Sequence, residues 1–369
     1  MESQGVIRKV SEHSDWCSSL AYVTKQDGSL RICLDPKRLN QSLRRCPHKI
    51  PTLEELNPVF AGAKVFSKLD AKAGYWSIPL HTDSQLITTF RQPFGRYCFQ
   101  RLPFGLNVSQ DIYQARIDSI LEGLPGVASI ADDICVFGSN QAEHDANLLK
   151  LMNRAIERAL VLNSEKCDIA KPEIIFFGNR YTADGILPDP SKLRDLNKMP
   201  KPSSKEDLQC FLGLLTFLSQ HVPNFASVAK PLRDMLKQDI PFIWDTDHDV
   251  CFTALKQLVN NSEALAYYDA TKPVILEVDA SQKGLGAALL QDGHVVAFAS
   301  KTLTQTQSNY SNIEREALGL VHGVHRFHTY IMSCIPGGNR PQALGQHLAE
   351  APHERPSAST ANISQTAGI

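Results

Sequence analysis

Long apolar runs are missing from this chain of 369 residues. The longest, such as residues 295–299, hold only a handful of residues, whereas a helix that crosses a bilayer needs roughly 18 to 20. The first residues also lack the basic and then apolar layout of a secretion signal. We therefore expect no membrane span and an intracellular, non-secreted protein.

Closely spaced cysteines are missing as well. The nine cysteines are odd in number, and no two of them lie within two or three residues of each other. This spacing suggests neither a disulfide framework nor a zinc site. With 43% hydrophobic and 21% charged residues, the composition is that of a globular protein, and the length predicts two or three domains.

Neither sign of charge dominates, since 38 basic residues stand against 39 acidic ones. Residues 1–240 nevertheless carry 30 basic and 27 acidic residues, whereas residues 241–369 carry 8 and 12. Five basic residues of the first part have no acid between them: Lys37, Arg38, Arg44, Arg45 and Lys49. Such a stretch suits a surface that follows phosphate groups, but it equally fits a solvated basic loop.

Strand and helix signals alternate in the first half. Apolar segments bounded by turn residues predict strands at residues 20–24, 30–34, 64–69 and 127–138. Apolar residues at helical spacing predict helices at about 109–122 and 141–161. Asp70 then ends one strand, and Asp132 and Asp133 stand at a turn inside the segment 127–138.

The second half changes in character near residue 187, where prolines punctuate short helices. Ser204, three residues before Asp207, predicts the start of a helix that runs to about residue 220. Three strands at 273–280, 285–291 and 294–300 and a long helix at about 307–331 follow, in the order β-β-β-α. Residues 334–369 lose all periodicity and are predicted to be disordered.

Asp70, Asp132 and Asp133 are candidate metal ligands. Like charges that gather at strand ends are costly without a cation. Two Mg²⁺ ions held by carboxylate oxygens can activate an attacking hydroxyl and stabilise the leaving oxygen in phosphoryl transfer. Taken alone, an Asp-Asp pair also fits ordinary turn chemistry.

Three stretches place these aspartates in a recognisable context. Residues 69–80 (LDAKAGYWSIPL), 102–107 (LPFGLN) and 130–134 (IADDI) resemble, in order and spacing, the polymerase motifs of reverse transcriptases. The Leu-Pro-Phe-Gly-Leu form resembles the Ty3/gypsy class of long-terminal-repeat retrotransposons. The resemblance covers roughly residues 5–333, and the chain departs from the family at Ile130, where an aromatic residue is common.

The resemblance implies an α+β fold: a right-hand polymerase with fingers, palm and thumb, followed by a helical connection and an incomplete ribonuclease H-like β-β-β-α unit. It implies four parts. These are the fingers and palm at residues 1–186, the thumb and connection helices at 187–270, the N-terminal half of a ribonuclease H-like domain at 271–333, and a disordered tail outside the family at 334–369.

The resemblance also implies a role for each motif residue. Asp70, Asp132 and Asp133 would be catalytic and would bind two Mg²⁺ ions. The residues that would bind the deoxynucleotide are Lys25, Arg31, Ala71, Tyr75, Phe104 and Gly105, and those of the primer grip are Phe177 and Gly178. Tyr75 would exclude a ribose 2′-hydroxyl, with a core tyrosine as the alternative reading.

In the ribonuclease H-like part, Asp279 and Glu316 match two metal-binding carboxylates, with Glu314 as a second choice for the helix ligand. The usual third and fourth carboxylates are absent, since the tail has no Asp and only Glu350 and Glu354 as acids. We therefore predict a truncated ribonuclease H domain without nuclease activity, in a fragment of a longer polyprotein.

The resulting hypothesis is an RNA-directed DNA polymerase that extends a primer on an RNA or DNA template with deoxynucleoside triphosphates. Other chains of the same pol polyprotein are expected partners, and the cytoplasm is the expected location, with the nucleus as an alternative. A catalytically inactive nucleic-acid-binding relic of a pol gene is the alternative function. A third reading is a frame from a decayed element that yields no stable protein.

Overall fold

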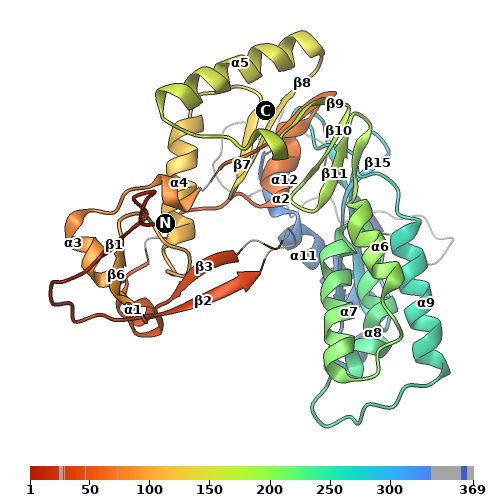
Figure 1. The fold of residues 1–369 in the computed structure, drawn as a ribbon. Helices are drawn as coiled ribbons and strands as arrows, with labels where there is room; N and C mark the ends of the chain where they lie inside the picture. The colour runs from red at the N-terminus through yellow and green to blue at the C-terminus, as the bar shows by residue number, and fades with distance from the viewer. Residues whose placement is uncertain (25–27, 29, 46, 73, 334–358, 364–369) are drawn as a thin grey trace. The chain divides into compact units, whose positions relative to one another are not determined.

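The computed structural model describes residues 1–24, 28, 30–45, 47–72, 74–333 and 359–363. The chain forms two compact units (Figure 1): Met1–Thr52 with Lys64–Pro172, and Leu53–Ala63 with Glu173–Ile369. The division at Pro172 lies ahead of the boundary predicted at residue 186. Among the described residues, no helix is long and apolar enough to cross a membrane.

The first unit is organised around an antiparallel sheet with the order β7-β8-β4-β9. Its strands are Val127–Ile130, Asp133–Gly138, Val65–Asp70 and Asp168–Lys171. Leu69, Ile134 and Val136 of this sheet pack against Leu151 of helix α5. The strands predicted at 64–69 and 127–138 are confirmed, because their apolar residues form this core.

Two helices flank the sheet, α4 (Ser109–Leu121) and α5 (Gln141–Glu157). Both confirm predicted helices, and α5 ends before the predicted residue 161. Tyr113 and Ile117 of α4 form a buried cluster with Ala71, directly after β4. The helix α4 therefore packs beside the end of the strand that carries Asp70.

The rest of the first unit consists of short elements. The hairpin of β2 (Ser19–Thr24) and β3 (Leu30–Asp35) confirms the prediction. A three-stranded sheet has the order β1-β6-β5, with strands Ile7–Lys9, Gly95–Phe99 and Phe90–Gln92. The short helices are α1 (Lys37–Ser42), α3 (Thr82–Gln85) and the 3₁₀ turns Tyr75–Ser77, Leu86–Thr88 and Ser164–Lys166.

The second unit begins with α2 (Leu53–Leu56) and the 3₁₀ turn Asn57–Phe60. It continues with the antiparallel sheet β10-β11-β12, which contains Glu173–Phe176, Asn179–Thr182 and Gly185–Pro188. The ring of Phe60 lies 5.9 Å from that of Phe176 and 4.6 Å from that of Tyr181. This buried aromatic contact explains why Leu53–Ala63 belongs to the second unit.

Four helices follow: α6 (Pro190–Lys198), α7 (Lys205–Leu218), α8 (Phe225–Asp234) and α9 (Thr246–Asn260). Leu208, Leu215 and Leu255 are buried in their common core. The start of α7 is as predicted, because the Ser204 hydroxyl accepts a hydrogen bond from the Asp207 backbone N at 3.1 Å. This part confirms the predicted helices.

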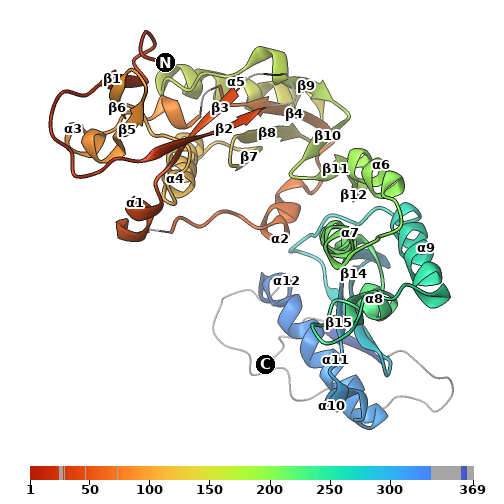
Figure 2. The ribbon, with the colours of Figure 1, turned by 60° about the horizontal axis from the view of Figure 1, so that its bottom comes forward.

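The last sheet has the order β15-β14-β13-β16. Its first three strands in the chain are β13 (Val274–Ala280), β14 (Gly284–Gln291) and β15 (His294–Thr302), as predicted. Figure 2 shows α11 lying along this sheet. The single helix predicted at 307–331 is wrong, since α10 (Gln305–Ser308), α11 (Asn312–Arg326) and α12 (His328–Ser333) replace it. Ser311 and Glu314 form a capping box at which α11 begins as a separate helix.

The fourth strand corrects another prediction. Ser359–Ile363 forms β16 and pairs antiparallel with β13, from Val278 to Val274. The prediction of disorder at 334–369 is therefore wrong for these five positions, and the remainder of that range lies outside the described residues. Without β16, β13 would be an edge strand with unpaired backbone N–H and C=O groups, and such groups can pair with an extended segment.

Candidate active site

Three aspartates from two distant segments meet at one end of β4 and β8, the inner strands of the sheet β7-β8-β4-β9. In the ladder between β4 and β8, Asp70 lies directly opposite Asp133. Asp132 is in the turn between β7 and β8, and its backbone O accepts a hydrogen bond from the Ala71 N at 3.2 Å. Strand pairing therefore brings together the carboxylates that the sequence predicted to act as one site.

The charge of Asp132 is poorly compensated. Its side chain is partly open to solvent, yet the protein around the carboxyl group removes enough water to raise its pKa. The negative charges of Asp70 and Asp133 raise this pKa further, and the positive charge of Arg31 opposes them. A divalent cation at this place would reverse the balance, because it favours the ionised carboxylate.

Asp133 differs from its two neighbours because it has a lysine partner. The Lys68 Nζ lies 3.0 Å from the Asp133 Oδ2. Within the described part of the chain, neither Asp70 nor Asp132 forms an ion pair. The three carboxylates are therefore not equivalent, which sequence alone did not reveal.

Asp70 and Asp132 fit a divalent cation by their chemistry. Both present hard carboxylate oxygens, which Mg²⁺ prefers, and loss of water together with the neighbouring carboxylates raises the pKa of Asp132. No group of three or more His, Cys, Asp or Glu side chains placed to hold a metal ion occurs among the described residues.

The turn that carries Asp132 is held by a glutamine that the sequence analysis missed. Ala131 has a backbone φ of 52°, in the left-handed region that non-glycine residues rarely adopt. Its N donates to the Oε1 of the fully buried Gln114 on α4 at 2.8 Å. Gln114 in turn donates to Asp118 at 2.9 Å. A polar residue within the apolar stripe of a predicted helix is the one signal that could have identified it.

Arg31, Phe104 and Tyr75 lie together in the first unit. The Arg31 guanidinium lies 5.3 Å from the centre of the Phe104 ring, and this ring lies 4.6 Å from that of Tyr75. The Tyr75 hydroxyl donates to Gln110, and burial raises the Tyr75 pKa. Three of the predicted nucleotide-binding side chains thus form one cluster, whereas Lys25 lies outside the described residues.

Gly105 has a specific backbone requirement. Its φ is 104°, and a Cβ at this position would lie 1.8 Å from the Leu34 carbonyl oxygen. The Phe104 carbonyl accepts from the Leu34 N at 2.8 Å, and the Gly105 carbonyl accepts from the Asn40 side chain at 3.0 Å. The loop of Phe104 is therefore docked on β3, and Asn40 is a second residue that the sequence analysis missed.

Phe177 and Gly178 form the turn between β10 and β11 in the second unit. Their φ angles are 45° and 76°, so both are left-handed, as in the tight hairpin turns that favour glycine or asparagine. Phe177 is nevertheless a large apolar residue, and 47% of it is exposed. An exposed aromatic side chain on a strained backbone indicates a contact surface.

Asp279 and Glu316 are on β13 and α11. Asp279 accepts a hydrogen bond from the Asn224 side chain at 3.3 Å. Glu314, the second choice, is committed to the capping box with Ser311.

Comparison with known families agrees with this arrangement. The sequence profile described as reverse transcriptase (RNA-dependent DNA polymerase) matches residues 23–181. A second profile, the RNase H-like domain found in reverse transcriptase, matches residues 244–335. The chain belongs to the reverse transcriptase family. The first match contains the three aspartates and the second contains the β13-β14-β15 strands.

Curated relatives are Pol polyproteins of Ty3/gypsy-type retrotransposons, which confirms the resemblance read from the motifs. The retrovirus-related Pol polyprotein from transposon 297 of Drosophila melanogaster is 31% identical over 90% of this chain and 32% of the relative. The transposon Tf2-3 polyprotein of Schizosaccharomyces pombe is 26% identical over 90% of this chain and 25% of the relative. This reverse transcriptase chain thus spans a third or less of their length.

Solved structures show the same fold. The foamy viral protease-reverse transcriptase dRH in complex with ds DNA has a TM-score of 0.83 and 23% identity, and the match covers 89% of this chain and 58% of that one. The foamy viral protease-reverse transcriptase in complex with RNA/DNA hybrid has a TM-score of 0.80 and 23% identity over 89% of this chain and 45% of that one. The chain therefore has the mixed α+β fold of a reverse transcriptase with an RNase H-like region.

Proposed function

We propose that this chain is an RNA-directed DNA polymerase that extends a primer with deoxynucleoside triphosphates on an RNA or DNA template. The observation that carries the proposal is the β4-β8 pairing, which sets Asp70 beside Asp132 and Asp133. In the reaction the primer 3′-oxygen bonds to the α-phosphorus, the bond to the β-phosphate breaks, and pyrophosphate leaves.

Asp70 and Asp132 would hold the two Mg²⁺ ions, with Asp133 beside them. The ions supply activation of the primer hydroxyl and neutralisation of the leaving pyrophosphate. Lys68 pairs with Asp133, so three carboxylates share this site with one lysine. This excess of negative charge suits two divalent cations.

The cluster of Arg31, Phe104 and Tyr75 would bind the incoming nucleotide, together with Lys25, Ala71 and Gly105. The Arg31 guanidinium would neutralise the triphosphate. Tyr75 is ordered by its contacts with Phe104 and Gln110. A ring held in this way would close the space that a ribose 2′-hydroxyl needs, so we expect selection of deoxynucleotides.

The remaining parts would serve the nucleic acid. We assign residues 1–186 to the fingers and palm, 187–270 to the thumb and connection helices, and 271–333 to a ribonuclease H-like part without nuclease activity. Phe177 and Gly178 would grip the primer end. Foamy viral relatives were solved with double-stranded DNA and with an RNA/DNA hybrid, which supports a primer-template partner, and other chains of the same polyprotein are further candidates. A cytoplasmic location, with the nucleus as the alternative, belongs to the same proposal.

The test is primer extension on an RNA template with the purified chain, Mg²⁺ and four deoxynucleotides. Asp132→Asn removes one ligand without changing the size of the side chain. Asp239→Asn makes the same chemical change at an exposed loop position and serves as the matched control. We expect extension by the parent chain and by Asp239→Asn, and none by Asp132→Asn.

Salt-sensitive binding of primer-template without extension would instead support the catalytically inactive relic. Extension that survives in Asp132→Asn would contradict the assigned site, because the reaction would then not depend on this carboxylate.

A further inference from the structure

Tyr113 is a buried tyrosine whose hydroxyl has the Asp132 carboxylate as its neighbouring acceptor. It lies on α4, is 1% exposed and packs with Ala71 and Ile117. Its hydroxyl oxygen is buried and makes no hydrogen bond of full geometry with any described residue. Burying a hydroxyl without a partner destabilises the folded state. A phenylalanine would fill the same space without this cost, so the hydroxyl calls for a reason outside packing.

The direction of this hydroxyl supplies the reason. Gly74 has no side chain, and a Cβ at that position would lie 2.8 Å from the Tyr113 hydroxyl oxygen and 2.9 Å from the Asp132 Oδ1. The two oxygens thus border the same small space. Any larger residue at position 74 would push against both, so Gly74 allows the phenol and the carboxylate to face each other.

The hydroxyl of Tyr113 can act as a donor, because a phenol has an ordinary pKa of about 10 and carries its proton at neutral pH. Tyr113 is buried, whereas Asp132 is exposed. The buried hydroxyl therefore lies behind a carboxylate that solvent ions can reach.

We propose that Tyr113 is a positioning residue for Asp132, whose hydroxyl donates a hydrogen bond to the Asp132 carboxylate when this carboxylate is ionised and holds a divalent cation. The inference rests on the proposed polymerase function, in which Asp132 is a metal ligand. Groups behind a ligand that fix its orientation commonly change metal affinity by about 10–100-fold when they are removed.

The test compares two properties of Tyr113→Phe: the affinity for Mn²⁺, measured by titration calorimetry on the full chain, and the midpoint of thermal unfolding without metal. We expect the Mn²⁺ affinity to fall about tenfold. The unfolding midpoint should stay the same or rise, because the buried hydroxyl makes no hydrogen bond of full geometry that the variant would lose. A tyrosine with a purely structural role would instead lower the unfolding midpoint and leave the Mn²⁺ affinity unchanged.

Tyr268→Phe is the matched control. This second buried tyrosine donates its hydroxyl to the Tyr330 carbonyl at 2.6 Å, within the second unit. Its loss should lower the unfolding midpoint and leave Mn²⁺ binding unchanged. A Tyr113→Phe variant that behaves like this control would overturn the proposal.

The Asp132→Asn variant separates the hypothesis that Asp132 holds a metal ion from the hypothesis that Tyr113 positions Asp132. If it abolishes Mn²⁺ binding while Tyr113→Phe binds as the parent chain does, Tyr113 has no positioning role and the polymerase site stands. If the parent chain binds no more Mn²⁺ than Asp132→Asn does, the assigned metal site is wrong, and the role of Tyr113 fails with it.

Discussion

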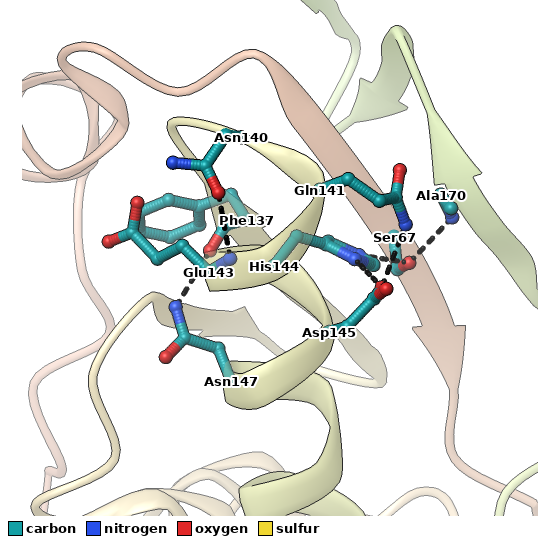
Figure 3. Close-up of polar contacts among 9 residues, drawn as sticks. All are labelled: Ser67, Phe137, Asn140, Gln141, Glu143, His144, Asp145, Asn147 and Ala170. Atoms are coloured by element: carbon teal, nitrogen blue, oxygen red, sulfur yellow. Dashed lines mark hydrogen bonds and ion pairs between the residues drawn. The ribbon is translucent and has the colours of Figure 1, made fainter.

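The ring of His144 on α5 is hydrogen-bonded to the hydroxyl of Ser67 on β4, with 2.7 Å between Nε2 and Oγ (Figure 3). The Ser67 Oγ also accepts from the Ala170 N at 2.9 Å, at the irregularity between β4 and β9. Asp145 Oδ1 lies 2.9 Å from the other ring nitrogen. These groups form a Ser-His-Asp series, but Ser67 and His144 are fully buried, so a substrate has no access to them. Their hydrogen bonds instead join β4, α5 and β9.

His144→Ala should therefore destabilise the first unit. The substitution leaves the buried Ser67 hydroxyl without its ring partner and opens a cavity, which costs about 2–4 kcal/mol of unfolding free energy. Urea unfolding followed by circular dichroism measures the change. Leu149→Ala, on the exposed side of the same helix, should change stability by less than about 0.5 kcal/mol. Equal effects of the two would show that the buried contact adds nothing.

Gln114→Ala should slow extension without weakening primer-template binding. The substitution removes the acceptor of the Ala131 N and so releases the left-handed turn before Asp132. Misplacement of a catalytic group by about 1 Å can cost about 100-fold in rate. Single-turnover extension measures the rate, and an equilibrium titration measures binding. A rate like that of the parent chain would mean that the turn at Ala131 keeps its conformation without the hydrogen bond to Gln114.

Gly105→Ala should impair nucleotide use. Its φ of 104° strains any other residue, and the added methyl group would collide with the Leu34 carbonyl. We expect a rise in the KM for deoxynucleotides of about tenfold, because the Phe104 loop must leave β3. Gly213→Ala, a position inside α7 with open space around it, should leave KM unchanged and stabilise the chain by about 0.5–1 kcal/mol. Steady-state kinetics of both variants give the comparison.

The stability of the metal-free chain should depend on Asp132 and on pH. Because the folded pKa of Asp132 is raised above its ordinary value of 3.8, the folded state binds this proton more tightly than the unfolded chain does. The destabilisation that the ionised Asp132 carboxylate causes is absent below pH 3.8 and grows as the pH rises through the raised pKa. Asp132→Asn should therefore raise the unfolding midpoint at pH 7, by roughly 2 °C since solvent screens the site. A gain of the same size at pH 3.5 would contradict this cause.

The ribonuclease H-like part should not cleave RNA. Asp279, the strand carboxylate of the proposed ribonuclease H-like part, accepts a hydrogen bond from the Asn224 side chain. We expect an RNA/DNA hybrid with Mg²⁺ to stay intact under conditions that support primer extension. Cleavage that disappears in Asp279→Asn would show that this carboxylate still works in a nuclease site.

Local sequence was sufficient for much of the site. The turn residues and apolar segments around Asp132 and Asp133 predicted a hairpin, and the strand before Asp70 was equally clear. Both depend on period-two alternation and turn chemistry, which act between neighbours in the chain. The motifs then indicated which two segments belong together, because their order and spacing match one family.

Other predictions failed where the outcome depends on distant partners. The helix at 307–331 has apolar spacing throughout, but the capping box of Ser311 and Glu314 competes with its continuation. The strand Ser359–Ile363 exists only through its pairing with β13. Local patterns carry no information about such a partner, because the partner lies about 80 residues away in the chain.

The sequence by itself determined the strands and helices of the core, the family and the identity of the three aspartates. Only the tertiary structure decided how these carboxylates differ. Lys68 pairs with Asp133, and the hydroxyl of Tyr113 faces Asp132. Gln114 holds the turn between β7 and β8 that carries Asp132. Side-chain directions and charge balance arise from packing between segments that are far apart in the chain, and only the folded arrangement of β4, β8 and α4 fixes them.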